Sequence, residues 1–371
     1  MASLLKTDKI VSTAASASEI TLPTPASPNG SGWYSGRNIL INGAMQVSQR
    51  GTSEAGLGFT SYGYYKAPDR WRASIEIGTW TVSQASIGPA GFPNSYKFDC
   101  TTADASPNVA YATQLACRIQ AQDLQELKYG TADAETITVS FWVRSAKTGT
   151  YIVELQHGET SISNSIAYTI SVADTWEKKE LSFSGYTTTA IADDNGIGLY
   201  LNFWLAAGTN YTSGTLAPNT WQSTAANKAV GQVNLADSTS NDWHLTGVQL
   251  EIGSVATPFE HKSFAQQLWE CQTYWQRVKQ HWWSYATSAA VIDSFVQLTP
   301  DMRAAPSVTL DDDTPTFQKV NVANYTGTSS SITASTLTTT TAFVRIDGFS
   351  GLANNSDYLL VSTPFYFEAE L

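Results

Sequence analysis

The chain changes character at Gly247-Val248-Gln249-Leu250-Glu251-Ile252-Gly253, which leads into Ala256-Thr257-Pro258-Phe259-Glu260 and then into a helix-like run from Phe264 to Val278. Strand patterns with a hydrophobic period of two precede this segment, whereas the run that follows it has the wider spacing of a helix. The segment therefore marks a boundary between two parts of the fold.

Short strand-like runs fill the region before this boundary, rich in β-branched and aromatic residues and bounded by Gly, Pro, Asn and Asp. Thr136 to Val143 and Tyr151 to Leu155 alternate at period two. Similar runs follow at Ile166 to Ile170, Lys179 to Phe183 and Gly198 to Leu205. Many short antiparallel strands without helices between them predict a β-sandwich or jelly roll, because two half-polar sheets bury their apolar faces against each other. We expect this domain to cover residues 37–260.

The run after the boundary has the spacing of a helix with one apolar strip. Ser263 can cap its first turn, and Gln266 can complete a capping box. The apolar residues follow at alternating intervals of four and three, which is the seam spacing of a left-handed coiled coil around a shared axis. Packing of the helix on its own domain would explain the same pattern. We predict a linking helix over residues 261–283, with oligomer-interface candidates at Phe264, Leu268, Cys271, Trp275 and Val278.

The two ends of the chain differ in composition. Residues 1–36 are small and polar with several Pro and Gly, and they hold too few apolar residues to bury a core. We expect an attachment tail there, in which short pieces around Ile10-Val11 and Ile20-Thr21-Leu22 could add a strand to a partner. Strand-like runs return after Trp283, so residues 284–371 are predicted to form a smaller β-domain. The sequence thus predicts a mainly β protein with an antiparallel β-sandwich, a linking α-helix and a C-terminal β-domain.

Composition and charge argue against several classes of function. The formal net charge of -11 disfavours a nucleic-acid partner, because phosphate binding needs clustered Lys and Arg. Only 14% of residues are charged, below the roughly one quarter typical of soluble domains, so the surface suits neutral contacts with sugars or other proteins. Cys100, Cys117 and Cys271 lack metal-ligand spacing and are interpreted as buried hydrophobes, with no disulfide, metal or cofactor expected. We expect neither a secretory signal nor a membrane-embedded segment.

Three segments of the chain form an ordered set. The first runs from Arg37-Asn38-Ile39-Leu40-Ile41-Asn42-Gly43 to Arg50-Gly51 and continues at Ala67-Pro68-Asp69-Arg70-Trp71. The second is the boundary segment with its Val-Gln-Leu-Glu-x-Gly and Thr-Pro-Phe-Glu motifs. The third begins near Pro300-Asp301-Met302-Arg303 and ends at Phe367-Glu368-Ala369-Glu370-Leu371. Together they resemble the receptor-binding tail fibres of bacteriophages, over residues 37–371.

The first domain also resembles the jelly-roll carbohydrate-binding modules. Those modules often hold a structural calcium through acidic residues on their first and last strands. The matching positions here are Gln46 and Thr246-Gly247, so the usual carboxylates are absent and no metal site is predicted.

The resemblance implies a non-enzymatic virion tail fibre, made in the host cytoplasm and assembled as a homotrimer. Residues 1–36 would attach to the phage tail or an adaptor protein, and the C-terminal domain would bind a host-surface glycan or an outer-surface protein. Three identical weak sites around one axis would act by avidity. The alternatives are a structural spacer or capsid-decoration fibre without a receptor site, and a polysaccharide depolymerase. The depolymerase is disfavoured because the long repeating strand pattern of β-helical tailspikes is missing.

Aromatic residues in polar runs are the candidate glycan-binding residues, because sugar rings present apolar faces to aromatic side chains. The densest cluster is His281-Trp282-Trp283-Ser284-Tyr285, and Trp221 lies in a polar, loop-like run. We take Trp282, Trp283, Tyr285 and Trp221 as candidates, with burial in a core as the alternative. No Gly-x-Ser-x-Gly, P-loop or His-Glu-x-x-His motif occurs, so no catalytic residue is assigned. Asp69-Arg70-Trp71 is interpreted as the start of a strand with a local ion pair.

Overall fold

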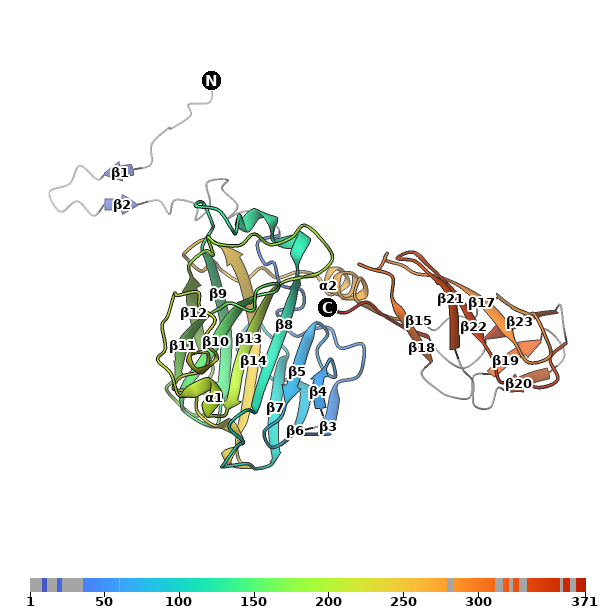
Figure 1. Cartoon of the computed structure of the whole chain (residues 1–371), viewed down its shortest axis with the longest axis horizontal. Coiled ribbons are helices and arrows are strands. Elements are labelled where there is room, and N and C mark those ends of the chain that lie inside the picture. Colours follow the sequence, from blue (N-terminus) through green and yellow to red (C-terminus); the bar gives the residue numbers. More distant parts are fainter. Residues whose placement is uncertain are drawn as a thin grey trace, which may run out of the picture.

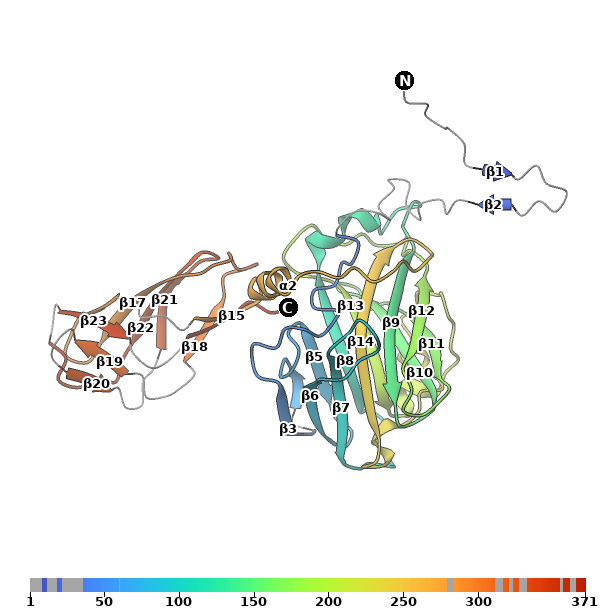
Figure 2. The ribbon, with the colours of Figure 1, turned by 180° about the vertical axis from the view of Figure 1, so that it is seen from behind.

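Two β bodies joined near a helix make up the protein (Figure 1). The structure, a computed structural model, describes residues 9–11, 19–21, 36–59, 61–278, 283–310, 316–319, 323–326, 332–353, 356–360 and 365–371. The larger body is a β-sandwich and the smaller, elongated body holds the C-terminal strands, as the view from behind also shows (Figure 2). Between them lies α2 (Phe264–Gln272). The predicted mainly β, antiparallel fold class is confirmed.

The N-terminal segment contributes two short described strands, β1 (Lys9–Val11) and β2 (Glu19–Thr21). They pair antiparallel with each other, with Ile10 opposite Ile20, and they extend away from the sandwich (Figure 1). The two strand-forming runs of the tail therefore pair within this chain.

The sandwich consists of two antiparallel six-stranded sheets. One has the order β11-β10-β13-β8-β5-β4 and the other β12-β9-β14-β7-β6-β3. From β7 to β10, and again from β11 to β14, each successive strand changes sheet, which gives the jelly-roll connectivity. The bounds are β3 (Ser53–Leu57), β4 (Ser61–Tyr64), β5 (Trp71–Ile75), β6 (Thr79–Ala85), β7 (Ser95–Thr102), β8 (Ala112–Gln120), β9 (Ile137–Ser145), β10 (Gly149–His157), β11 (Ser163–Ile170), β12 (Glu177–Phe183), β13 (Ile197–Ala207) and β14 (Asp242–Ile252). Short helical turns lie between strands at η2 (Ala121–Leu127), α1 (Thr209–Thr212), η3 (Ala225–Asn227) and η4 (Leu235–Asp237).

Alternation along the strands builds the core between the two sheets. On β13, Leu199, Leu201 and Phe203 are fully buried, and Trp71 and Trp243 fill the same cluster from other strands. Each large apolar side chain buried in this way stabilises the fold by about 1.5–3 kcal/mol. This cluster is therefore the main source of stability for the sandwich.

The boundary segment closes the sandwich as β14 and then folds back on it. Thr257 donates its backbone N–H at 2.9 Å and its hydroxyl at 2.6 Å to the Glu251 carboxylate. The Glu260 N–H donates to Gln249 Oε1 at 2.8 Å, and the Glu260 carboxylate accepts from the Asn38 N–H at 2.8 Å. The two motifs of the segment therefore hold the first and last parts of the sandwich together.

The helix begins as predicted but forms only half of the predicted capping box. The Ser263 hydroxyl accepts from the Gln266 N–H at 3.3 Å. The Gln266 side chain, however, donates to Glu270 Oε1 at 3.2 Å rather than reaching back to the cap. One half of the box is thus replaced by a contact along the helix surface.

The helix also ends earlier than predicted. α2 stops at Gln272, and β15 (Trp275–Val278) then pairs antiparallel with β24 (Phe365–Glu368). A single helix over residues 261–283 is therefore wrong, because the backbone after α2 takes its hydrogen bonds from a strand at the far end of the chain. Periodicity cannot reveal such a distant partner.

The C-terminal body contains a three-stranded sheet of order β15-β24-β18 and a seven-stranded sheet of order β20-β19-β23-β16-β17-β22-β21. Both sheets contribute to a second core cluster, which includes Val296, Val344 and Phe367. The remaining bounds are β16 (Trp283–Ala286), β17 (Ile292–Gln297), β18 (Ser307–Leu310), β19 (Thr316–Lys319), β20 (Ala323–Thr326), β21 (Ile332–Leu337), β22 (Thr341–Ile346) and β23 (Ser356–Leu360).

The C-terminus returns to the sandwich beside α2 (Figures 1 and 2). The Leu371 backbone oxygen accepts from the Arg118 guanidinium and from the Tyr65 hydroxyl, the latter at 3.4 Å. The Ala369 N–H donates to the Tyr274 carbonyl at 2.8 Å. The last residues of the chain therefore close the junction between the two bodies.

Candidate functional site

A buried ion network fills the junction between the two bodies. Arg70 pairs with Glu370, whose carboxylate also accepts from Arg50 at 3.0 Å. The Arg70 guanidinium lies 3.4 Å from the centre of the Tyr274 ring. The local ion pair predicted within Asp69-Arg70-Trp71 is wrong, because the partner of Arg70 is a carboxylate at the other end of the chain.

Asp69 instead binds Gln49. The Gln49 backbone N–H and side-chain amide donate to the Asp69 carboxylate at 2.9 and 2.6 Å. Burial raises the pKa of Asp69, and Arg50 together with these hydrogen bonds offsets part of that rise. Arg70 has a left-handed backbone conformation, with φ 73°. Adjacent residues thus serve two different partners.

Two groups at the junction, Arg70 and Tyr65, have pKa values displaced from their usual range. Burial lowers the pKa of Arg70, but the Glu370 carboxylate outweighs burial and the pKa lies above its usual range. Burial, assisted by Glu370, raises the pKa of Tyr65 to about 12. Arg70 therefore stays positive and Tyr65 neutral near neutral pH.

A cleft of about 470 Å³, here termed the junction cleft, opens beside this network. Its sandwich side is lined by Gln49, Arg50, Tyr64, Tyr65 and Lys66. Its other side is formed by the three-stranded sheet, with Trp275, Arg277, Thr309, Tyr366 and Glu368. The cleft therefore exists only because β15 and β24 dock against the sandwich.

Rings and cations alternate in the junction cleft. The Arg50 guanidinium lies 4.8 Å from the centre of the Trp275 ring, and Lys66 Nζ lies 5.7 Å from that of Tyr64. The Trp275 and Tyr366 rings are 5.2 Å apart and tilted by 35°. Cations within about 6 Å of a ring centre are attracted by its quadrupole. The rings thus attract two of the cations that line the cleft, Arg50 and Lys66.

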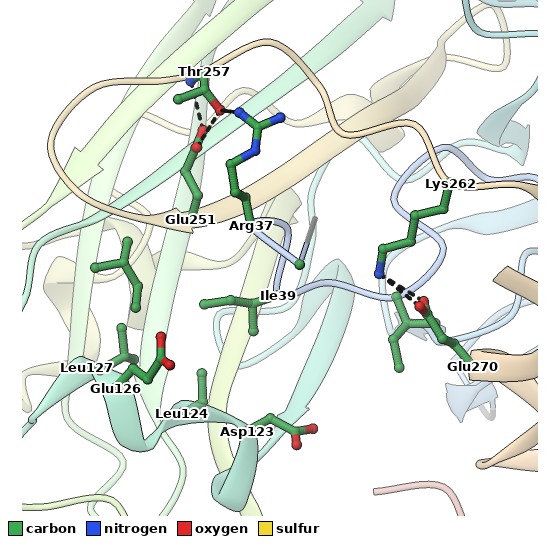
Figure 3. A pocket seen from close by; sticks show the side chains of 13 residues that line it. Arg37, Ile39, Asp123, Leu124, Glu126, Leu127, Glu251, Thr257, Lys262 and Glu270 are labelled. Carbon is green, nitrogen blue, oxygen red and sulfur yellow. Dashed lines mark hydrogen bonds and ion pairs between the residues drawn. The ribbon is translucent and has the colours of Figure 1, made fainter. Parts of the chain in front are cut away.

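A second cavity, of about 360 Å³, lies on the side of the sandwich where α2 begins (Figure 3). Arg37 donates to Thr257 Oγ1 at 2.7 Å, and Lys262 donates to both carboxylate oxygens of Glu270 at 3.0 Å. The rest of the lining consists of apolar side chains and three carboxylates, at Ile39, Ile41, Leu124, Leu127, Ile252, Asp123, Glu126 and Glu251. None of the described residues that line it is aromatic. This cavity therefore lacks a ring on which a sugar could stack.

The predicted aromatic cluster lies only in part within the described residues. Trp282 is outside them, and of Trp283 only the backbone is described, as the first residue of β16. Tyr285 is 43% exposed on β16. Its neighbours on the adjacent strand are Asp293, directly opposite, and Phe295, two residues further along.

Tyr285 belongs to an exposed aromatic patch, here termed the aromatic face, which also contains Phe295 and Phe343. Phe295 is 53% exposed on β17, and its partner across the ladder, Phe343 on β22, is 36% exposed. Asp293 and Arg345, the neighbouring cross-strand pair on the same face, form a bidentate ion pair at 2.8 Å. Because β16, β17 and β22 are consecutive in the sheet, three aromatic side chains share one surface.

Trp221 lies against the sandwich core. Its indole N–H donates to the Ser184 carbonyl at 2.8 Å, and its ring contacts those of Tyr129 and Tyr186. The side chain is half-buried. Its role in glycan binding stays a prediction.

The five interface candidates do not form one helical strip in this chain. Phe264, Leu268 and Cys271 lie on α2, whereas Trp275 and Val278 lie on β15. Cys271 and Trp275 are buried within the chain, while Phe264 is 57% exposed. The continuous seam is therefore wrong, because the helix ends before Trp275.

An apolar strip does remain exposed on α2. Phe264, Leu268 and Trp269 fall within an arc of about 140° of the helix, and Phe264 and Trp269 are each more than half exposed. Trp269 was missed because the four-three spacing passes over it. The part these residues play in an oligomer is untested.

Three further features bear on function. The described residues contain no group of three His, Cys, Asp or Glu side chains that could hold a metal ion. No helix in the described part of the chain is long and apolar enough to cross a membrane. The three cysteines are buried, as predicted, and burial raises the pKa of Cys117 to about 11.

Comparison with known proteins gave matches among solved structures alone. No protein-family model and no curated protein matches the sequence. The chain is similar to the enzymatically active domain of tailspike protein 4 of bacteriophage CBA120, with 14% identity and a TM-score of 0.31 over 58% of this chain and 21% of that one. TmCBM61, solved with β-1,4-galactotriose, has 10% identity and a TM-score of 0.27 over 58% of this chain and 99% of that one. The xylan-binding CBM22-2 domain of Paenibacillus barcinonensis Xyn10C has 16% identity and a TM-score of 0.26 over 49% and 91%. Likenesses at this level say nothing of function.

Sequence reasoning missed Phe295 and Phe343, although a signal for them exists. On β17, Ser294 and Val296 are buried while Phe295 and Gln297 are exposed. On β22, Phe343 likewise alternates with buried Val344. An aromatic residue on the polar side of an alternating strand is that signal.

Proposed function

We propose that the chain is a bacteriophage virion fibre that binds a host-surface receptor, in the first place a glycan, without catalysis. The aromatic face carries this proposal. Tyr285, Phe295 and Phe343 are large, exposed and share one surface of the sheet, and the Asp293–Arg345 ion pair lies beside them. Aromatic faces stack on the apolar side of sugar rings, and nearby polar groups bind the hydroxyls. The N-terminal segment would attach the fibre to the phage tail or an adaptor protein.

Adsorption competition tests the receptor role. The purified chain is expected to bind host cells and to reduce phage attachment, and Phe295→Ser with Tyr285→Ser should abolish both effects. A matched control is Val172→Ser, an exposed apolar residue on the sandwich. Loss of competition by the control to the same extent, or no competition by the unchanged chain, would contradict the proposal.

Mass measurement in solution tests the proposed homotrimer. The exposed strip of Phe264, Leu268 and Trp269 supports an assembly at α2, since clustered apolar side chains are favourable to bury between copies. Three weak sites on one particle would gain strength by avidity. A strictly monomeric full chain at micromolar concentration would exclude the trimer.

A further inference from the structure

The junction cleft lies apart from the aromatic face and has a lining of its own. We propose that it binds a saccharide that carries an anionic group, either a carboxylate or a phosphate. The sugar ring would lie against Tyr64 and Tyr366, and the anion beside Arg277 and Arg50. This site goes beyond the proposed receptor face, which lies on the other sheet of the C-terminal body.

One face of the three-stranded sheet forms a wall of the cleft by simple alternation. Phe365 and Phe367 of β24 are buried, whereas Tyr366 and Glu368 point to the opposite side. Arg277 of β15 and Thr309 of β18 are both register partners of Tyr366. A cation, an aromatic ring and a hydroxyl therefore stand in one row across three strands, which is a suitable set for a charged sugar.

Cations outnumber carboxylates among the residues that line the cleft, which holds Arg50, Lys66, Arg277 and Glu368. Arg50 also pairs with Glu370 at 3.0 Å, and Lys66 pairs with Glu54 at 3.7 Å across the surface. An exposed pair such as that of Lys66 is weak, so an anionic ligand can compete for the cation. The formal charge of -11 disfavours anions on the rest of the chain.

Arg50 lines the cleft, and one nitrogen of its guanidinium is buried without a hydrogen-bond partner in the described part of the chain. Its Nη2 binds Glu370, while its buried Nη1 has no hydrogen-bond partner among the described residues. The guanidinium is held between the rings of Trp275 and Tyr65, at 4.8 and 5.4 Å from their centres. A planar guanidinium fixed in this way is suited to a carboxylate or phosphate oxygen.

Size and ring content favour a saccharide over other anions. The volume of about 470 Å³ falls within the roughly 300–1,000 Å³ range of small-molecule sites. A bare ion would need neither this volume nor the exposed ring of Tyr64. A nucleic acid would require a longer basic track than three cations provide.

Calorimetric titration of the full chain tests the proposal. The probes are oligosaccharides of glucuronate, galacturonate or sialate, a glucose phosphate, the neutral oligosaccharide of glucose, and inorganic phosphate alone. At least one anionic sugar is expected to bind about tenfold or more tightly than the neutral sugar, and less tightly as salt rises. Arg277→Gln and Tyr64→Ala should each weaken that binding about tenfold or more, with Arg277→Lys intermediate.

The control is Lys178→Gln, which removes an exposed cation of the sandwich that pairs with Glu180. It should leave binding unchanged, as should the aromatic-face variant Tyr285→Ser. Binding of no anionic sugar, equal binding of neutral and anionic sugars, or equal binding of phosphate alone would overturn the proposal. If the Tyr285→Ser variant loses host adsorption but still binds the sugar in the cleft, the two sites act independently.

Discussion

The junction should open when Glu370 loses its charge. Glu370→Gln keeps the size of the side chain but leaves the buried Arg70 without its counter-charge. The side chains of Glu370 and Arg70 are 5% and 3% exposed. Removing one partner of a buried ion pair costs about 3–5 kcal/mol. Arg70 keeps the Arg118 carbonyl at 2.8 Å and the Tyr274 ring, so we expect the low end, about 3 kcal/mol.

Glu368 provides the matched control, two residues earlier on the same strand. Its side chain is 49% exposed and lies 3.8 Å from Arg50. An exposed pair of this kind contributes about 0–1 kcal/mol. Glu368→Gln should therefore leave the junction closed, although it makes the same chemical change.

Native-state hydrogen exchange measures this opening directly. In Glu370→Gln the amides of β15 and β24 should exchange about 100-fold faster than in the unchanged chain, since each 1.4 kcal/mol is about tenfold. Amides of β9, in the middle of the sandwich, should be unaffected. Equal acceleration in both variants, or none in Glu370→Gln, would show that the ion network does not hold the junction.

Three further outcomes are expected. Gly43→Ala should destabilise the sandwich by about 3 kcal/mol or more in urea unfolding, because its Cβ would collide with the Val248 carbonyl; unchanged stability would refute this. Burial lowers the pKa of His157, so the unfolded chain takes up a proton near pH 6.5 that the folded chain refuses. Stability should fall as the pH drops below that value, and less so in His157→Gln; parallel pH profiles would contradict the reasoning. Excess EDTA should leave the melting temperature within about 2 °C, because Gln46 and Thr246 stand where calcium-binding carboxylates are expected; a larger drop would indicate a metal.

The sandwich could be predicted from the sequence because the hydrophobic pattern of each strand lies within that strand. Each strand shows its own alternation, as in Leu199, Leu201 and Phe203, and the turns between strands carry Gly, Pro, Asn and Asp. Sheets built from such strands have few ways to bury their apolar faces. The C-terminal strands were predictable for the same reason, but the sequence analysis did not predict which face of each strand is buried and which is exposed.

The end of α2 could not be predicted in this way. Trp275 and Val278 continue the four-three spacing, and nothing in their neighbourhood forbids a helix. The end of the helix is determined by β24, because Glu368 of that strand pairs with Trp275 from the other end of the C-terminal body. Tertiary pairing of this kind overrides local periodicity, and a single sequence does not contain the pairing.

Separation along the sequence also explains why Arg70 was assigned to the wrong ion-pair partner. The observed pair gives the boundary segment a mechanical role as the start of a fixed joint. Adjacent Asp69 and Arg70 suggest a pair by proximity, yet folding brings Glu370 to Arg70 and leaves Asp69 to Gln49. A chain whose last residues lock into its first domain cannot let its two bodies swing freely about α2. Under the proposed receptor role, a fibre that transmits a contact from the aromatic face to the N-terminal segment requires such a fixed joint. If that proposal holds, opening the joint with Glu370→Gln should weaken host adsorption even though every residue of the aromatic face is intact.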